Sequence, residues 1–294
     1  MLDWHVLCEH PHMRLLTVLL IATYVFAQTP DEVAWRILEH GVHEGNPIKR
    51  RQAILAMSLV RPTVRPVALI SDALQDKEAS VREAACATLG EINARTSIPK
   101  LQIAVADPVP EVTFAAAKAL YAMGDQTGVN ILTEVLLGEQ SDASGFVSGS
   151  IRSMRLKLHD PKALLMLGVN EGAGLAGPFG MGLPLAEGLL KDNQASGKTV
   201  AALLLATDRS PRSLDALKRS LEDKNWTVRT AAARAIAKRD ATALYDNVAM
   251  LLDDKRDEAA YSAAAAVIRL RQPLNATQAP PRLQNRRKPA GAVK

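Results

Sequence analysis

Apolar and small residues recur along the chain in a fixed frame. In the stretch that begins at Asp76, an apolar residue follows five positions later, two alanines follow at eight and nine, and a large apolar residue follows at thirteen. These offsets place the apolar side chains on one face of a helix with 3.6 residues per turn. The frame therefore predicts an amphipathic helix wherever it starts, and it starts again at Glu44, Asp107, Asp192, Asp223 and Asp254.

Consecutive frames are 31 or 32 residues apart except across the middle of the chain, and we call this spacing the repeat period. It leaves room for a second, outer helix before each frame, which we expect over residues 30–41, 65–75, 97–106, 184–191, 211–221 and 241–252. A fixed period of this length with two helices per unit is typical of an α-solenoid. The sequence thus predicts an all-α, right-handed solenoid of about seven or eight helical hairpins over residues 28–271.

The acid that opens each frame can accept hydrogen bonds from the first N–H groups of the helix. A cation follows six positions later in several units, as in the pairs Asp76/Arg82, Asp223/Arg229 and Asp192/Lys198, whereas Thr113 and Ala260 interrupt the series. This pattern resembles the short bacterial HEAT repeats, including those of phycobilin lyases, over roughly residues 30–271. The resemblance implies a ladder of turn aspartates and helix arginines along the stack. It implies a fold and no particular activity.

The frame fails between Ser141 and Asp192. Residues 161–169 have the pattern of another outer helix, but the stretch Gly172–Gly182 that follows contains five glycines and a proline. Such a composition disfavours a stable helix. The stretch is interpreted either as a decayed repeat or as a functional loop on a rigid scaffold.

Residues 1–27 differ from the rest of the chain. Residues 15–26 are apolar, Met13 and Arg14 precede them, and small residues stand at positions 25 and 27. This is the pattern of a secretory signal peptide cleaved before Gln28, with Met13 as the possible true start. The run is shorter than a membrane span of about 20 residues. We therefore expect an exported bacterial protein, periplasmic or secreted, with no transmembrane span in the mature chain.

The C-terminal stretch, residues 272–294, is basic and rich in Pro, Gln, Asn and Ala, which is typical of a disordered tail. It contains no acid, and its cations include Arg282, Arg286, Arg287 and Lys288. The tail is a candidate electrostatic contact to an anionic surface. Because it accounts for most of the net charge of +5, the rest of the chain is close to neutral, and we expect no nucleic-acid partner.

No catalytic, cofactor or metal site is expected. His40, His43 and Glu44 lie close together, but they fall at a helix end. The HEAT-like enzyme deoxyhypusine hydroxylase uses several His-Glu dipeptides, and the chain after residue 27 has only His43-Glu44. Gly197-Lys198-Thr199 is similar to the end of a phosphate-binding loop but lacks its first glycine and preceding strand. Cys86 falls inside a helix with a buried pattern.

The leading function is therefore a non-enzymatic, exported protein-interaction scaffold whose concave face, formed by the second helices, holds an unidentified protein. The exposed positions expected to touch that partner are Arg51, Glu83, Lys118, Thr230 and Arg234. The competing hypothesis is an enzyme or small-ligand-binding protein built on Gly172–Gly182. A purely structural envelope protein is the third.

Overall fold

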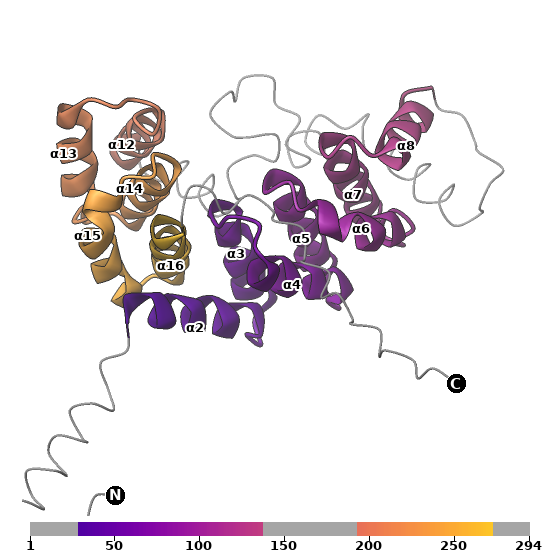
Figure 1. The fold of residues 1–294 in the computed structure, drawn as a ribbon, viewed down its shortest axis with the longest axis horizontal. Helices are drawn as coiled ribbons and strands as arrows, with labels where there is room; N and C mark the ends of the chain where they lie inside the picture. The colour runs from indigo at the N-terminus through magenta and orange to yellow at the C-terminus, as the bar shows by residue number, and fades with distance from the viewer. Residues whose placement is uncertain (1–28, 138–192, 273–294) are drawn as a thin grey trace, which may run out of the picture.

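The computed structural model describes residues 29–137 and 193–272, and every regular element in these two ranges is a helix (Figure 1). The expected all-α solenoid is confirmed. The first range contains α2 (Pro30–Val42), α3 (Pro47–Ala56), η2 (Met57–Leu59), α4 (Val64–Asp72), η3 (Ala73–Gln75), α5 (Ala79–Glu91), η4 (Arg95–Ser97), α6 (Ile98–Ala104), α7 (Pro110–Ala122) and α8 (Gln126–Leu137).

The second range repeats the same hairpin design. It contains α12 (Asn193–Leu204), α13 (Pro211–Ser220), α14 (Trp226–Lys238), η5 (Thr242–Leu244), α15 (Tyr245–Ala249), η6 (Met250–Asp253) and α16 (Asp257–Arg271). The two ranges together hold five complete outer–inner hairpins, ending at the single helices α8 and α12. Helix α8 was not predicted, because no acid-led frame follows it.

Side-chain caps mark the starts of several helices, and residues with positive φ follow the ends of others. Thr29 forms a capping box with Glu32 at the start of α2, and Asn46 caps α3 by accepting from the N–H of Ile48. The ends of α5, α7 and α14 are followed by residues with positive φ, which reverse the chain into the next outer helix: Asn93, Gly124 and Asp240. Asn93 and Gly124 are one repeat period apart, so the helix stops recur with the helix starts.

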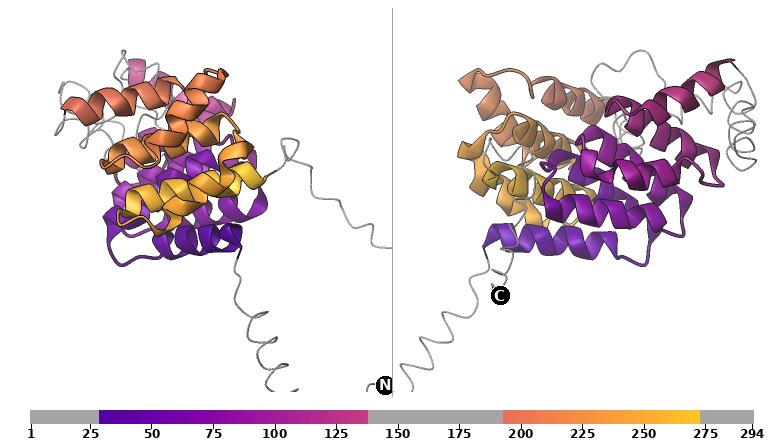
Figure 2. Two further views of the ribbon diagram at one scale, coloured as in Figure 1. Left: turned by 90° about the vertical axis from the view of Figure 1, so that its left-hand side faces the viewer. Right: turned by 45° about the vertical axis from the view of Figure 1, so that its right-hand side comes forward.

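The two ends of the described chain meet. Helix α16, the last inner helix, packs against α2 and α3 of the first hairpin (Figure 1 and both views of Figure 2). The inner helices therefore stack in the order α12, α14, α16, α3, α5, α7. Along the stack, the last repeat therefore lies next to the first. The described stack ends at α12 and α8, the two helices that border the middle of the sequence.

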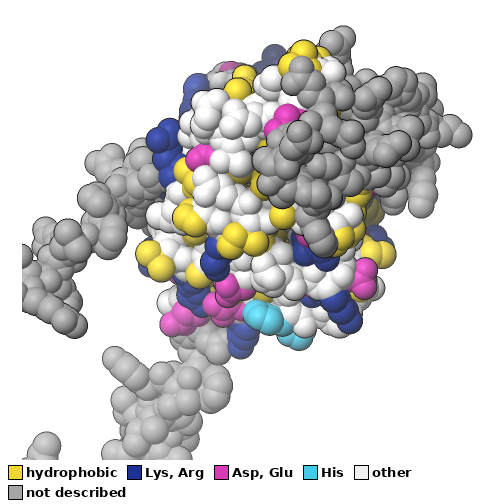
Figure 3. Space-filling view, turned by 90° about the vertical axis from the view of Figure 1, so that its right-hand side faces the viewer, with side chains coloured by type: hydrophobic (Ala, Val, Ile, Leu, Met, Phe, Trp, Pro, Cys, Tyr) yellow, Lys and Arg dark blue, Asp and Glu magenta, His cyan; other side chains and the backbone are white. Residues whose placement is uncertain are grey.

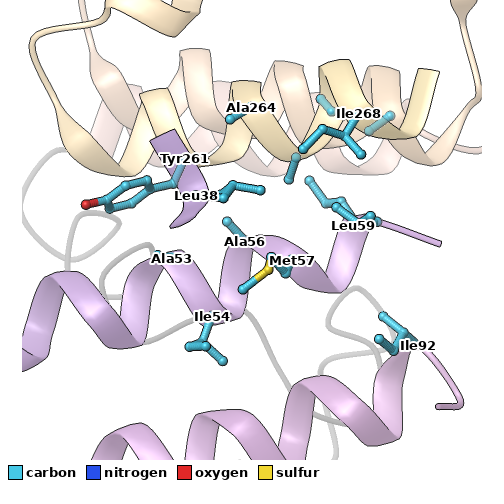
Figure 4. Packing of buried hydrophobic residues seen from close by; sticks show 14 of the residues in the cluster. Leu38, Ala53, Ile54, Ala56, Met57, Leu59, Ile92, Tyr261, Ala264 and Ile268 are labelled. Atoms are coloured by element: carbon cyan, nitrogen blue, oxygen red, sulfur yellow. The ribbon is translucent and has the colours of Figure 1, made fainter. Parts of the chain in front are cut away.

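The junction between the last and first repeats has an apolar core. Leu38 of α2 and Ala53 of α3 lie in one buried cluster with Tyr261 and Ala264 of α16, as Figure 4 shows. A Cβ at Gly41 would come within 2.6 Å of the Tyr261 ring and 2.7 Å of the Ala53 Cβ. Gly41 is thus required by the close approach of α2, α3 and α16 as well as by its place near a helix end.

A polar network, which we call the clasp, closes the same junction. Arg61 Nη2 donates to Asp240 Oδ1 over 2.8 Å, and Arg269 Nε donates to the same oxygen over 3.0 Å. Arg61 also donates to the carbonyl of Arg269, and Arg269 donates to the carbonyl of Leu59. The backbone N–H of Arg61 donates to Gln272 Oε1. Because most of these bonds join the two ends of the described sequence, they fix the order of the stack.

Candidate functional site

The inner helices form the candidate site, and a ladder of ion pairs holds them at a fixed spacing. Each ladder arginine donates Nε and Nη2 to both oxygens of one aspartate in the next unit, with distances between 2.6 and 2.9 Å. This two-point geometry is the strongest form of a charged hydrogen bond. The pairs are Arg50–Asp76, Arg82–Asp107 and Arg229–Asp254.

The same arginines also close their own turns. Nη1 of each one donates to two consecutive turn carbonyls over 2.8–3.2 Å, as Arg82 does to Asp76 and Lys77. One side chain thus satisfies carbonyls of its own turn and the carboxylate of the next. Arg50 was not predicted as a ladder residue, although it stands six positions after Glu44 as Arg82 does after Asp76.

Hydrogen bonding outweighs burial at two ladder aspartates, Asp76 and Asp254. Burial alone would raise the pKa of Asp76, but hydrogen bonds from Arg50 and from the backbone of Glu78 leave this pKa below its ordinary value. The pKa of Asp254 is lowered in the same way, burial being opposed by Arg229 and by the backbone of Arg256. These carboxylates therefore remain ionised at neutral pH.

The ladder weakens where its cation changes. Lys198 reaches Asp223 through a single 2.8 Å contact and is more exposed than the arginines. Thr113 replaces the arginine in α7, and its hydroxyl donates to the carbonyl of Asp107 over 3.1 Å. The predicted ladder residue Asp192 lies outside the described residues.

The expected partner-binding residues are less exposed than the sequence suggested. Thr230 was predicted to be exposed, and this prediction is wrong. It is buried, with 5% of its surface exposed, and its hydroxyl donates to the carbonyl of Trp226. The other four are only half-buried, because neighbouring inner helices crowd their side chains: Arg51, Glu83, Lys118 and Arg234. We call these four residues the inner seam.

Two charges of the inner seam lack the pairing that the ladder charges have. Glu83 and Arg234 make no hydrogen bond with any residue of the described ranges. Burial raises the pKa of Glu83, with Arg51 and Lys118 opposing the shift. Burial also lowers the pKa of Arg234, and the negative charge of Glu91 on α5 opposes that shift. The interaction between Arg234 and Glu91 shows that opposite halves of the sequence lie close together at the inner surface.

Lys118 belongs to the same surface. Its ammonium lies 5.8 Å from the centre of the Phe114 ring. Burial lowers its pKa, and Glu83 on the neighbouring helix α5 opposes that shift. The seam thus places a base, an acid and a base on the successive inner helices α3, α5 and α7.

The structure gives the other sequence motifs ordinary structural roles. His40 Nε2 lies 3.3 Å from Glu44, and His43 Nδ1 lies 2.7 Å from the carbonyl of Glu39. No group of three metal-ligating side chains comes together among the described residues. Gly197 and Thr199 lie within helix α12. Cys86 is buried, and burial raises the pKa of its thiol.

Two candidate regions fall outside what the structure describes: Gly172–Gly182 and the tail from residue 273. Within the described ranges, no helix combines the length and apolarity that a bilayer crossing needs.

A regular stack of helical hairpins with a ladder between its turns defines an α-solenoid protein. A family model described as HEAT repeats matches residues 36–113, 67–144 and 183–269, and the chain belongs to the HEAT-repeat family. Among solved structures, human deoxyhypusine hydroxylase in complex with glycerol is similar at 19% identity, over 89% of this chain and 91% of that chain, with a TM-score of 0.32. At that TM-score the likeness carries no information about activity. A comparison with curated proteins finds no match.

Proposed function

We propose that this protein is an exported, non-enzymatic scaffold that binds a protein partner through the inner seam. The contrast between two sets of charges carries the proposal. The ladder arginines direct their donors to carboxylate and carbonyl oxygens, whereas Glu83 and Arg234 are half-buried without a hydrogen bond to any described residue. Half-buried titratable groups whose pKa is shifted by desolvation and by nearby charges are typical of functional positions.

The scaffold that holds these side chains suits a binding role. Arg234 stands on α14, whose neighbours Ala233 and Ala235 are fully buried, so its backbone cannot shift without disturbing the stack. A partner that offers a carboxylate to Arg234 and a cation to Glu83 gains charged hydrogen bonds, and little of the desolvation cost remains to be met. Export rests on the apolar leader at residues 15–26.

The test is a cross-linked pull-down from the cell envelope with four tagged chains: wild type, the double variant Glu83→Lys/Arg234→Glu, a double variant on the outer surface (Glu78→Lys/Arg95→Glu), and a chain lacking residues 272–294. Glu78 and Arg95 are exposed, so the outer variant makes the same two charge changes away from the seam. We expect the wild type, the outer variant and the chain without the tail to retain one defined partner, and the seam variant to lose it.

Two results would count against this function. Equal retention by the seam variant would remove the seam as the binding surface. If only the chain without residues 272–294 loses the partner, the basic C-terminal stretch and not the seam makes the contact. Circular dichroism and melting curves of all four chains check that each is folded.

A further inference from the structure

The described chain is electrically asymmetric. Residues 29–137 carry 11 Lys and Arg against 13 Asp and Glu, whereas residues 193–272 carry 14 against 10. The two ranges together carry a net charge of only +2 because these opposite imbalances partly cancel. The stack order places the basic block at one side of the molecule, where α13 and α15 form the outer layer (left view of Figure 2).

The excess positive charge gathers on and beside α13. Five exposed cations there make no ion pair with any described residue. The exposed acids nearest to them along α13 and its following turn are Asp215 and Glu222, and those on the next outer helix, beside Met250, are Asp246 and Asp253. Arg212 and Arg219 are seven positions apart on α13, about two helical turns, so they share its outward face. The five cations are Arg212, Lys218, Arg219, Lys224 and Lys238.

An exposed apolar side chain continues this surface. Met250, which is 76% exposed, stands one repeat period after Arg219 and therefore occupies the equivalent position on the next outer helix. Helices α13 and α15 follow each other along this side of the molecule in Figure 1, and Met250 comes directly after α15, so a flat partner can touch both residues. We call the five cations and Met250 the α13 surface.

We propose that the α13 surface attaches this protein to an anionic phospholipid membrane. Lys and Arg near such a surface are attracted by its negative potential, and an apolar side chain on the next outer helix can enter the headgroup boundary. An outer surface suits a flat bilayer because it can touch a plane with several side chains at once. A nucleic-acid backbone would use the cations but would leave Met250 without a partner.

The opposite side of the molecule lacks this combination. Figure 3 shows the side formed by the first block, where positive, negative and apolar side chains are interspersed and the histidines lie at one edge. Ile103, at the position on α6 that corresponds to Met250, is 68% exposed. However, exposed Lys100 beside it is paired with Asp72. This block therefore supplies matched control residues.

The test measures partitioning of the processed chain, from Gln28 to Lys294, onto vesicles of phosphatidylcholine with and without phosphatidylglycerol. The variant Arg212→Glu/Lys218→Glu/Arg219→Glu is compared with Lys77→Glu/Arg95→Glu/Lys100→Glu, which changes the net charge equally at exposed positions of the other block. At roughly 1 kcal/mol for each cation near the surface, we expect the first variant to bind on the order of 100-fold more weakly. The second should stay within about threefold of wild type, because distant charges are screened.

Met250→Ser and Ile103→Ser separate the apolar contribution. We expect only Met250→Ser to weaken binding, by a factor that does not change with salt, whereas the loss in the α13 triple variant should shrink as salt rises. Equal losses in both triple variants, or no loss in either, would overturn the proposal. So would wild-type binding to neutral vesicles, or a loss confined to binding of a short DNA duplex.

Discussion

At the scale of single residues, Arg82 shows how one side chain joins two repeats. It binds both carboxylate oxygens of Asp107 in the next unit and two carbonyls of its own turn. Its side chain is 13% exposed and that of Asp107 is 9% exposed. Solvent therefore screens this pair little, and removing one partner leaves the other charged and poorly hydrated.

The variant Arg82→Ala should lower the free energy of unfolding by about 3–5 kcal/mol, the usual effect of breaking a buried pair. Its control is Lys100→Ala, because Lys100 and Asp72 form an exposed pair at 3.4 Å with 54% and 78% of their side chains exposed. That variant should change stability by about 0–1 kcal/mol. Urea unfolding measures both, and equal effects would show that the ladder contributes no more than a surface contact.

The ladder also predicts how stability changes with pH. The folded pKa values of Asp76, Asp223 and Asp254 lie below their ordinary values. Their contribution is therefore fully present above about pH 4, the unfolded value, and is lost as the pH falls through the folded values. We expect Asp254→Asn to be less stable than wild type at neutral pH and to approach wild type below about pH 4. A constant difference across the titration would contradict this pH dependence.

At the scale of helices, the sequence predicted the inner elements well because their cause is local. An alanine at the ninth position and an apolar residue at the thirteenth mark each inner helix, three of the six frames also have alanine at the eighth, and Ala84, Ala85 and Leu89 are all buried as that pattern requires. The exposure of the seam residues was predicted less well. It depends on how tightly neighbouring helices crowd, which no single repeat determines.

Gly41 was interpreted from the sequence only as a helix end, yet it is also the contact point of three helices. Gly41→Ala should destabilise the protein by about 1–3 kcal/mol, because the new Cβ would overlap the Tyr261 ring and Ala53. Gly45→Ala is the control, since a Cβ there meets no atom within 4 Å. Thermal melting of the two variants tests this: similar melting temperatures would mean that α16 does not approach α2 and α3 so closely.

At the scale of the whole molecule, the order of the repeats is the feature that the sequence did not predict. The repeat period gives neighbours along the chain, but it says nothing about whether the last repeat meets the first. That contact depends on long-range partners such as Arg61 with Asp240, and Lys49 with Asp257 at 3.0 Å. It brings Glu91 and Arg234 towards each other and so shapes the inner seam.

The clasp should therefore stabilise both blocks together. Arg61→Ala removes its side-chain bonds to Asp240, Arg269 and Gln272, and we expect a lower melting temperature with one cooperative transition becoming two. Arg95→Ala, an exposed change on η4, should leave the single transition intact. Calorimetry distinguishes these outcomes, and a single unshifted transition in Arg61→Ala would show that the clasp contributes little to cooperativity.

The most direct test of the stack order is zero-length carbodiimide cross-linking of the monomer, followed by mass spectrometry of its peptides. The Lys198–Asp223 pair, at 2.8 Å between neighbouring units, is the internal standard. We predict that a Lys49–Asp257 cross-link forms within one chain alongside that standard. If the standard forms and the Lys49–Asp257 cross-link does not, the last repeat does not stack on the first.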